Sequence, residues 1–505
     1  MERNLRWQNI FFGKTKEEKN QRKAQELPSS PCSGLVSLLF PRAFFKEECL
    51  LSKSMATPPR FEVELEVDDD EFSKLIRWTN SPRVVVDNDS CSDATVIRVD
   101  CVNKHGILLQ VVQVLTDLNL FIRKAYITSD GSWFMDVFYV TDRDGRKVLD
   151  KEVISYIKKS LESDDLFFPK LRNSVGITPS NKHTLIELAG SDRPGLLSEI
   201  CAVLANQSCH VAKAELWTHN SRVAAVLHVT DESTKGAIED PQRLSMIKER
   251  VCNVLRGDND PRAARMIVSM GLTHPERRLH QMMFDDRDYE RVVAKEVAQD
   301  ESRPKVTVTN CLEREYTVVI LRSRDRPKLL FDTVCTLTDM QYVVYHGTVS
   351  SDEDEAYQEY YIRNADGLPV SEEVEQRHLI QCLEAAIERR SSEGLALELR
   401  EDGKFSLPEI TRVFRENGLT IRRAEISREG AQVADNFYVS ETSGSPVDPD
   451  KIDLIRRQLG LTNLTAKQNT LQPSNPPEVV STVSLFFANL FRVSFQSFRL
   501  IRSYS

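Results

Sequence analysis

The sequence predicts an α+β protein built from small repeated modules, each an antiparallel sheet with two helices on one face. Three observations predict this fold. Apolar positions recur in the same register in four stretches of the chain, each stretch opens with a short alternating strand, and each closes with a second helical segment. The predicted order within a module is β-α-β-β-α, with a fourth strand expected after the second helix.

The four stretches align without gaps from Asn103, Asp192, Asp325 and Asp402. Five, eight and twelve residues after each origin stand apolar residues or threonine, and this spacing describes one face of an amphipathic helix. Nineteen and twenty-four residues on, each stretch has an aliphatic residue, and twenty-two on it has alanine or glycine. The chain therefore contains four copies of one structural unit.

The elements follow in the same order in each copy. The first strands are expected at 95–101, 184–189, 316–322 and 395–399, where apolar and polar residues alternate. A loop and a helix come next, and then two strands joined by turns at 129–131, 219–221, 351–353 and 428–430. The closing helices are expected at 151–161, 241–255, 372–389 and 449–459.

These elements set the predicted domain boundaries. We expect a disordered N-terminal extension at 1–67, module 1 at 92–172, module 2 at 183–257, a linker at 258–314, module 3 at 315–394, module 4 at 395–461 and a C-terminal tail at 462–505. Units of 70 to 80 residues bury little surface alone, so they are expected to pair. We predict that module 1 pairs with module 2, and module 3 with module 4.

Composition excludes several classes of protein. The 505 residues are 40% hydrophobic and 28% charged, which excludes wholesale disorder. A net charge of −9 argues against nucleic-acid binding, and no apolar run is long enough to span a membrane. The ten cysteines form no CxxC motif, which favours free thiols and a cytoplasmic or nuclear protein.

The two ends of the chain are less regular. Glu17, Glu18 and further acids argue against a transit peptide, and we interpret Met55 as the functional start. In the tail, residues 484–502 carry phenylalanines at helical spacing with arginines and no acid. Such a segment can lie on a membrane surface, dock on a partner or pack on its own domain.

The loop between the first strand and the first helix is the candidate ligand site. We name its copies loop 1 (103–108), loop 2 (192–197), loop 3 (325–330) and loop 4 (402–407). Exposed N–H groups at a helix start suit a carboxylate, and a neighbouring Asp or Asn can accept hydrogen bonds from an ammonium group. The candidate residues, for a zwitterionic amino acid, are Asn103, Gly106, Ile107, Leu108, Asp192, Gly195, Leu196 and Leu197.

Other interpretations stay open at these loops. Each loop can be only a well-capped helix start. Lys328 replaces the glycine in loop 3 and Phe405 stands at its place in loop 4, so we expect modules 3 and 4 to act as pairing partners. The histidines at 274 and 280 do not share a helical face, and we interpret their segment as a charged connector rather than a metal site. We expect no cofactor, no metal and no catalytic residue, because no complete nucleotide, hydrolase or metalloprotease motif is present.

These residues resemble a known family. Ser191-Asp192-Arg193-Pro194-Gly195-Leu196-Leu197, in a repeated βαββαβ unit, resembles the ACT domain, a ferredoxin-like regulatory module that typically binds amino acids between two paired copies. Four such units resemble the plant ACT-domain-repeat proteins, and the segments 80–87, 129–137 and 276–284 extend the likeness over roughly 68–505. Similar loops occur in the glutamine-reading sensor domains of bacterial uridylyltransferases.

The resemblance implies a non-enzymatic sensor of an amino acid such as glutamine, working as a homodimer or with a protein partner. The alternative is a scaffold of ACT modules that has lost ligand binding. If loop 2 holds a carboxylate on its N–H groups, Gly195→Val should abolish binding and Asp192→Ala should weaken it by about 1–3 kcal/mol. Phe405→Ala in loop 4 should leave the affinity nearly unchanged.

Overall fold

The structure is a computed structural model. It describes residues 82–103, 105–129, 133–162, 182–256, 265–269, 274–290, 303–311, 313–352, 354–390, 394–401, 406–428, 433–443, 445, 447–460 and 464–467. The predicted N-terminal extension with Met55, the tail segment 484–502 and Phe405 lie outside these residues.

The four modules have the order that the repeat predicts. Their first strands are β2 (Thr95–Val102), β5 (Thr184–Ser191), β10 (Tyr316–Arg324) and β13 (Leu395–Glu401). Their first helices are α3 (Ile107–Asp117), α6 (Leu196–Asn206), α9 (Leu329–Asp339) and α11 (Leu407–Glu416). The hairpins are β3 (Phe121–Ser129) with β4 (Trp133–Thr141), β6 (Cys209–His219) with β7 (Arg222–Asp231), β11 (Tyr342–Asp352) with β12 (Glu355–Asn364), and β14 (Leu419–Ser427) with β15 (Val433–Glu441). The closing helices are α4 (Lys151–Glu162), α7 (Pro241–Arg256), α10 (Glu373–Arg390) and α12 (Pro449–Leu459).

The repeated apolar positions form the cores. The residues twelve after each origin, Leu115, Leu204, Leu337 and Phe414, are all at most 1% exposed. One core joins the strands and helices of modules 1 and 3, and a second joins those of modules 2 and 4. The fold class predicted from the sequence, α+β with helices on one face of antiparallel sheets, is therefore confirmed.

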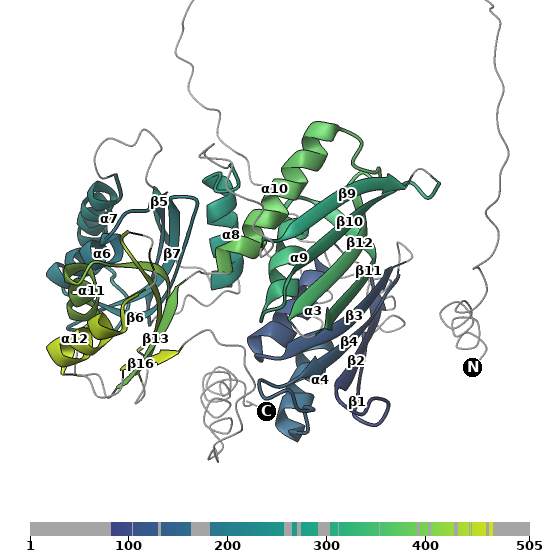
Figure 1. Cartoon of the computed structure of the whole chain (residues 1–505), viewed down its shortest axis with the longest axis horizontal. Helices are drawn as coiled ribbons and strands as arrows, with labels where there is room; N and C mark the ends of the chain where they lie inside the picture. Colours follow the sequence, from purple (N-terminus) through teal and green to yellow (C-terminus); the bar gives the residue numbers. More distant parts are fainter. Residues whose placement is uncertain are drawn as a thin grey trace, which may run out of the picture. The chain divides into compact units, whose positions relative to one another are not determined.

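The pairing of the modules differs from the prediction. Module 1 pairs with module 3 and module 2 with module 4, in two eight-stranded sheets ordered β1-β2-β4-β3-β11-β12-β10-β9 and β16-β13-β15-β14-β6-β7-β5-β8. Figure 1 shows the strands of module 1 continuing into the strands of module 3. The antiparallel junctions are β3 with β11 and β6 with β14. The prediction assumed that neighbours in sequence pair, whereas the junction strands join modules that are two apart.

A small residue meets a large one at both junctions. The residue twenty-two after each origin lies opposite the partner's residue twenty-four after its origin: Ala125 with Val349, Gly347 with Ile127, Ala214 with Ile426 and Ala424 with Leu216. Cross-strand partners lie about 5 Å apart, so a small side chain makes room for a large one under the covering helices. This alternation fixes the register of both junctions.

The edge strands also depart from the prediction in two modules. In modules 2 and 4 the fourth strand follows the second helix, as β8 (Arg265–Ser269) and β16 (Leu464–Lys467). In modules 1 and 3 it precedes the first strand, as β1 (Arg83–Asp87) and β9 (Lys305–Cys311). Each edge strand pairs with the first strand of its module, and that position can be reached from either end of the module.

The predicted linker 258–314 contains secondary structure. Besides β8 and β9 it includes α8 (Pro275–Asp285). This helix packs on one face of the second sheet, and the helices of modules 2 and 4 cover the opposite face. Leu279, Met282 and Met283 of α8 form a buried cluster with Trp217 and four further residues of β5 and β7. The apolar residues of α8 therefore cover one face of the second sheet. The sequence analysis considered only the charged residues of this segment and did not predict that contact.

The described residues contain no helix long and apolar enough to cross a membrane. Within the same residues, no group of His, Cys, Asp or Glu is arranged to hold a metal ion. Their eight cysteines are free thiols.

Candidate functional site

Loops 1, 2 and 3 share one backbone shape. The residue before helices α3, α6 and α9 is left-handed in each: Gly106 has φ 82° and ψ 1°, Gly195 has φ 82° and ψ 0°, and Lys328 has φ 66° and ψ 9°. None of these three helices has a side-chain cap. The open alternative of helix starts capped by a side chain is therefore wrong for these three helices, and the side chains of Asn103 and Asp192 have other partners.

Asp192 of loop 2 faces the partner module. Its side chain is only 10% exposed, and a carboxylate oxygen lies 3.7 Å from Nη1 of Arg422 in module 4. Burial raises the pKa of Asp192 to about 6, although Arg422 and the backbone N–H of Arg193 act in the opposite direction. The Asp192–Arg422 contact thus joins modules 2 and 4 through a largely buried carboxylate.

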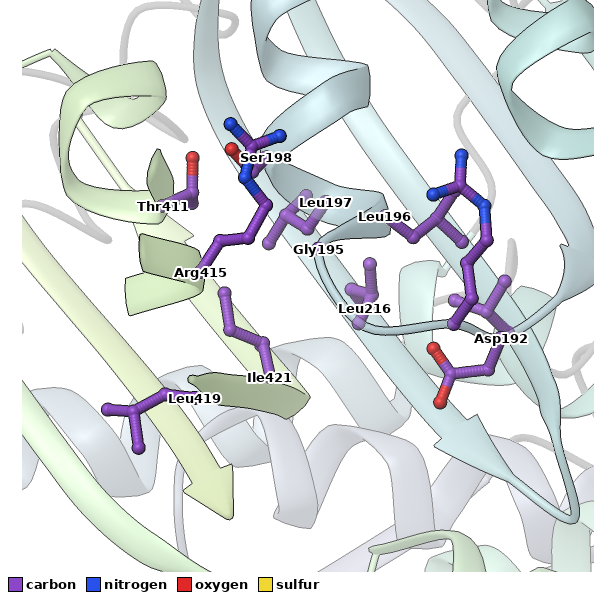
Figure 2. Close-up of a pocket in the computed structure, with 12 residues that line it drawn as sticks. Asp192, Gly195, Leu196, Leu197, Ser198, Leu216, Thr411, Arg415, Leu419 and Ile421 are labelled. Carbon is purple, nitrogen blue, oxygen red and sulfur yellow. The ribbon is translucent and has the colours of Figure 1, made fainter. Parts of the chain in front are cut away.

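A cavity lies between loop 2 and module 4. Asp192, Gly195, Leu196 and Leu197 line it from module 2, and Thr411, Arg415, Leu419 and Ile421 line it from module 4. Figure 2 shows Arg415 reaching from α11 towards Gly195 and Ser198. The hollow measures about 340 Å³ including space open to solvent, but the side chains leave free room for about one water molecule.

Arg415 is the side chain that narrows this cavity. A Cβ built on Gly195 would lie 2.5 Å from Cδ and 3.0 Å from Cγ of Arg415. The arginine stem therefore occupies the space that the glycine leaves free. The N–H of Leu196, one of the three expected carboxylate donors, already donates to the carbonyl of Arg193 over 3.2 Å. An amino acid entering here must displace the Arg415 stem.

Loop 3 lines a second cavity, against module 1. The hollow measures about 490 Å³ including open space, and Asp325, Arg326 and Lys328 face Arg123 and Thr116 across it. Burial raises the pKa of Asp325, while a hydrogen bond from Ser351 and the charge of Arg123 oppose the rise. The loop that we expected to act only as a pairing partner is thus one of the two that line a described cavity.

The same strand position supplies the arginine that acts on Asp192 of loop 2 and the one that acts on Asp325 of loop 3, although only Arg123 lines its cavity. Arg422 and Arg123 both lie twenty residues after their module's origin, at the β-bulge of the strand that forms the junction. A bulge turns a side chain out of the regular alternation and re-aims it. The bulge positions of modules 3 and 2 are Tyr345 and Ala212. Arg422 therefore pairs with Asp192 across the modules of one sheet, and the charge of Arg123 acts on Asp325 across those of the other.

The candidate residues of loop 1 line neither of these two cavities. Asn103 donates a hydrogen bond from Nδ2 to Oγ of Ser129 over 2.7 Å, and a Cβ on Gly106 would lie 3.7 Å from Thr338 of module 3. Ile107 and Leu108 are buried in the core of the first sheet. The residues that sequence analysis missed are Arg123, Arg415 and Arg422; only the shared register of Arg123 and Arg422 signalled any of them.

Three segments of the chain match models of known families. Residues 90–167 match the ACR family N-terminal ACT domain, 182–240 match the ACT domain and 305–391 match the ACR9-like, ACT-like domain. The regulatory subunit of aspartate kinase from Thermus thermophilus is a distant structural likeness at 11% identity and a TM-score of 0.14, covering 41% of this chain and 93% of that one. That score is too low to support an argument.

Curated relatives match over most of the chain. The ACT domain-containing protein ACR6 of Arabidopsis thaliana is 57% identical over 434 residues, covering 84% of this chain and all of the relative. The ACT domain-containing protein ACR4 of the same plant is 55% identical over 445 residues, covering 86% of this chain and 98% of the relative. The chain therefore belongs to the plant ACR family of ACT domain-containing proteins.

Proposed function

We propose that this protein is a non-enzymatic regulatory protein that binds a free amino acid at the boundary between paired ACT modules. The observation that carries the proposal is the pairing of the buried Asp192 carboxylate with the partly exposed Arg422 beside the start of α6. A zwitterionic amino acid has a positive group for Asp192 and a negative group for Arg422. Its ammonium group would contact the Asp192 carboxylate, and its carboxylate would contact Arg422 and the displaced Arg415.

The physical advantage lies in the partly satisfied pair. At 3.7 Å, the Asp192–Arg422 contact is longer than a strong charge-assisted hydrogen bond. Inserting a ligand with matching charges gives each group a closer partner while the Asp192 carboxylate stays out of water. Charged hydrogen bonds of this kind contribute about 1.5–3 kcal/mol each.

Calorimetric titration of the full chain with the twenty proteinogenic L-amino acids tests the proposal. Gly195→Val changes both the space and a left-handed backbone, so Arg422→Gln and Asp192→Asn are the sharper variants. Each should lower the affinity at least tenfold, since about 1.4 kcal/mol corresponds to a factor of ten.

The matched control is Arg412→Gln. Arg412 also belongs to module 4, but its side chain is 57% exposed and pairs with Glu416 on the helix surface. Its substitution should leave the affinity unchanged. An affinity and a number of bound equivalents that are both unchanged in the two site variants would reject this site.

The scaffold alternative is favoured by the narrowness of the loop 2 cavity, which the Arg415 stem nearly fills. In a scaffold of ACT modules the Asp192–Arg422 pair would only hold two modules together. The titration separates the two functions, because a scaffold binds none of the twenty amino acids.

A further inference from the structure

Loop 3 differs from loop 2 because one of its side chains contacts helix α8. Lys328 keeps the left-handed backbone of the glycine that it replaces, so the loop retains its shape. Its Nζ donates a hydrogen bond to Oε1 of Glu276 on α8. Glu276 also accepts from Nη2 of Arg390 over 3.0 Å, and its side chain is 12% exposed. Lys328, which lines the loop 3 cavity, therefore forms an ion pair with helix α8.

Arg326 gives loop 3 a second connection. Its Nη1 donates to Asp332 over 2.7 Å and its Nη2 to the carbonyl of Ile387 over 2.8 Å. Asp332 is fully buried and also accepts from His280 of α8 over 2.8 Å and from Arg390. In loop 2, the guanidinium of the corresponding Arg193 donates to Glu199 and to the carbonyl of Val254, both within module 2.

The charge states of this network follow from its partners. Burial alone would raise the pKa of Glu276, but Arg390 and Lys328 outweigh it and the pKa falls to about 2. His280 donates from Nε2 to Asp332 and accepts at Nδ1 from Arg389 over 2.9 Å, an arrangement that suits the neutral ring. The lysine–glutamate contact is thus a true ion pair at neutral pH.

Helix α8 carries the connection to the second sheet. Its apolar residues pack on β5, β6 and β7, and Nε of Arg278 lies 2.9 Å from Glu187 of β5. Arg390 stacks on the ring of Trp217 in β6, with its guanidinium carbon 4.6 Å from the ring centre. The next residue along that strand towards the junction, Leu216, lines the loop 2 cavity. A continuous set of contacts therefore runs from loop 3 through α8 to β6.

We propose that loop 3 and Arg123 form a second amino-acid site, and that its occupancy is transmitted through Lys328 and Glu276 to α8. This inference rests on the function proposed above, because it requires the same zwitterion chemistry at Asp325 and Arg123. A ligand carboxylate in the cavity competes with Glu276 for the Lys328 ammonium group. Binding therefore weakens one of the contacts that hold α8 against modules 1 and 3.

A ligand shifts a conformational equilibrium only by its differential affinity for the two states. Here the difference is physical: Lys328 can contact either Glu276 or the ligand. Loop 2 has glycine at the same position and lacks this alternative. The two proposed sites therefore bind the amino acid with the same kinds of groups, but only the loop 3 site changes the contacts of α8.

The test combines calorimetry with hydrogen–deuterium exchange of the full chain, using the proteinogenic L-amino acid that binds most tightly in the screen. Two equivalents should bind to the unmodified protein, and one each to Arg123→Gln and Arg422→Gln. Amide exchange in peptides covering 275–285 should accelerate severalfold on saturation, in the unmodified protein and in Arg422→Gln, but not in Arg123→Gln.

Glu276→Gln separates transmission from binding. Glu276 belongs to α8 and not to the cavity lining, so this variant should still bind two equivalents while exchange in α8 no longer responds to them. The control is Glu290→Gln, because Glu290 pairs only on the surface with Arg287, 3.2 Å away, and should leave the response intact.

The outcomes distinguish the two proposals. No binding of any amino acid would overturn both. One equivalent, lost in Arg422→Gln alone, would overturn the loop 3 site and keep the proposed function. Two equivalents with no change in α8 exchange, or an unaltered response in Glu276→Gln, would overturn the transmission.

Discussion

A single backbone conformation organises the candidate sites at the residue scale. Gly106, Gly195 and Lys328 all adopt the left-handed region directly before a helix. This region costs a residue with a side chain roughly 1–2 kcal/mol. For Lys328, the ion pair with Glu276 offsets that cost, which explains how lysine stands where the other two loops have glycine.

The raised pKa of Asp192 should make the proposed binding at loop 2 dependent on pH. Above a pH of about 6 the carboxylate is ionised and can hold an ammonium group; below it, the neutral acid cannot. The affinity for the amino acid should therefore fall as the pH decreases from 7 to 5, as measured by calorimetric titration. At the loop 2 site, Asp192→Asn should bind weakly and show no such dependence, and a pH-independent affinity of this site in the unmodified protein would contradict the ammonium contact.

The same shift has an opposite consequence for stability without ligand. The folded state binds the Asp192 proton more tightly than the unfolded chain, whose ordinary pKa is 3.8. The contribution of Asp192 to the free energy of unfolding therefore decreases as the pH rises from about 4 to about 6. Binding and stability thus respond to this carboxyl group with opposite signs.

The junction strands and α8 are the elements that assemble the modules. The junctions depend on a small residue opposite a large one, and α8 depends on Leu279, Met282 and Met283, all at most 5% exposed. The polar side of α8 carries the ion pairs described above. Each of these elements therefore has two faces that contact different modules.

Gly347 at the β3–β11 junction should tolerate no side chain. An added Cβ would lie 3.0 Å from Cδ1 of Ile127 and 3.0 Å from Cδ1 of Tyr360. Gly347→Ala should lower the free energy of unfolding by about 1–3 kcal/mol, the usual range for overpacking, measured by urea denaturation. The control is Gly190→Ala in β5, where the nearest atom is Cδ2 of Leu255 at 3.5 Å, an ordinary contact. Equal stability of the two variants would argue against the tight junction.

Alternating pairing determines the organisation of the whole molecule. Modules 1 and 3 share one sheet and modules 2 and 4 the other, so the chain passes between the sheets after each module. Both candidate cavities lie between modules that are two apart in sequence. A fragment holding only modules 1 and 2 would therefore lack one side of each cavity.

Engineered disulfides test the pairing directly. The central positions of the junctions are Tyr126 opposite Thr348 and Glu215 opposite Glu425. Cysteines at 126 and 348, or at 215 and 425, should cross-link under mild oxidation, as read by mass spectrometry of peptides. Cysteines at 126 and 215 should not, because the structure places them in different sheets. A disulfide between 126 and 215 would instead support the predicted pairing of module 1 with module 2.

Local sequence patterns were sufficient for the modules themselves. The apolar spacing predicted the four first helices and their buried faces, since Leu108, Leu197, Leu330 and Leu407 are all at most 7% exposed. It also located loop 2, whose Asp192 and Gly195 line a cavity. These features depend on periodicity within about 25 residues, and a sequence displays that directly.

The partners of the modules were decided only by the tertiary structure. All four modules carry the same small and large positions at the junction strand, so this pattern permits any two to pair. For the same reason the sequence could not show that Arg123 faces loop 3 and Arg422 faces loop 2. The sequence analysis placed α8 in a linker because this helix belongs to none of the four modules. Its apolar residues are recognisable as a packing surface only once Trp217 is seen to lie against them. Contacts between residues far apart in the chain, rather than local periodicity, determine where the candidate ligand sites lie.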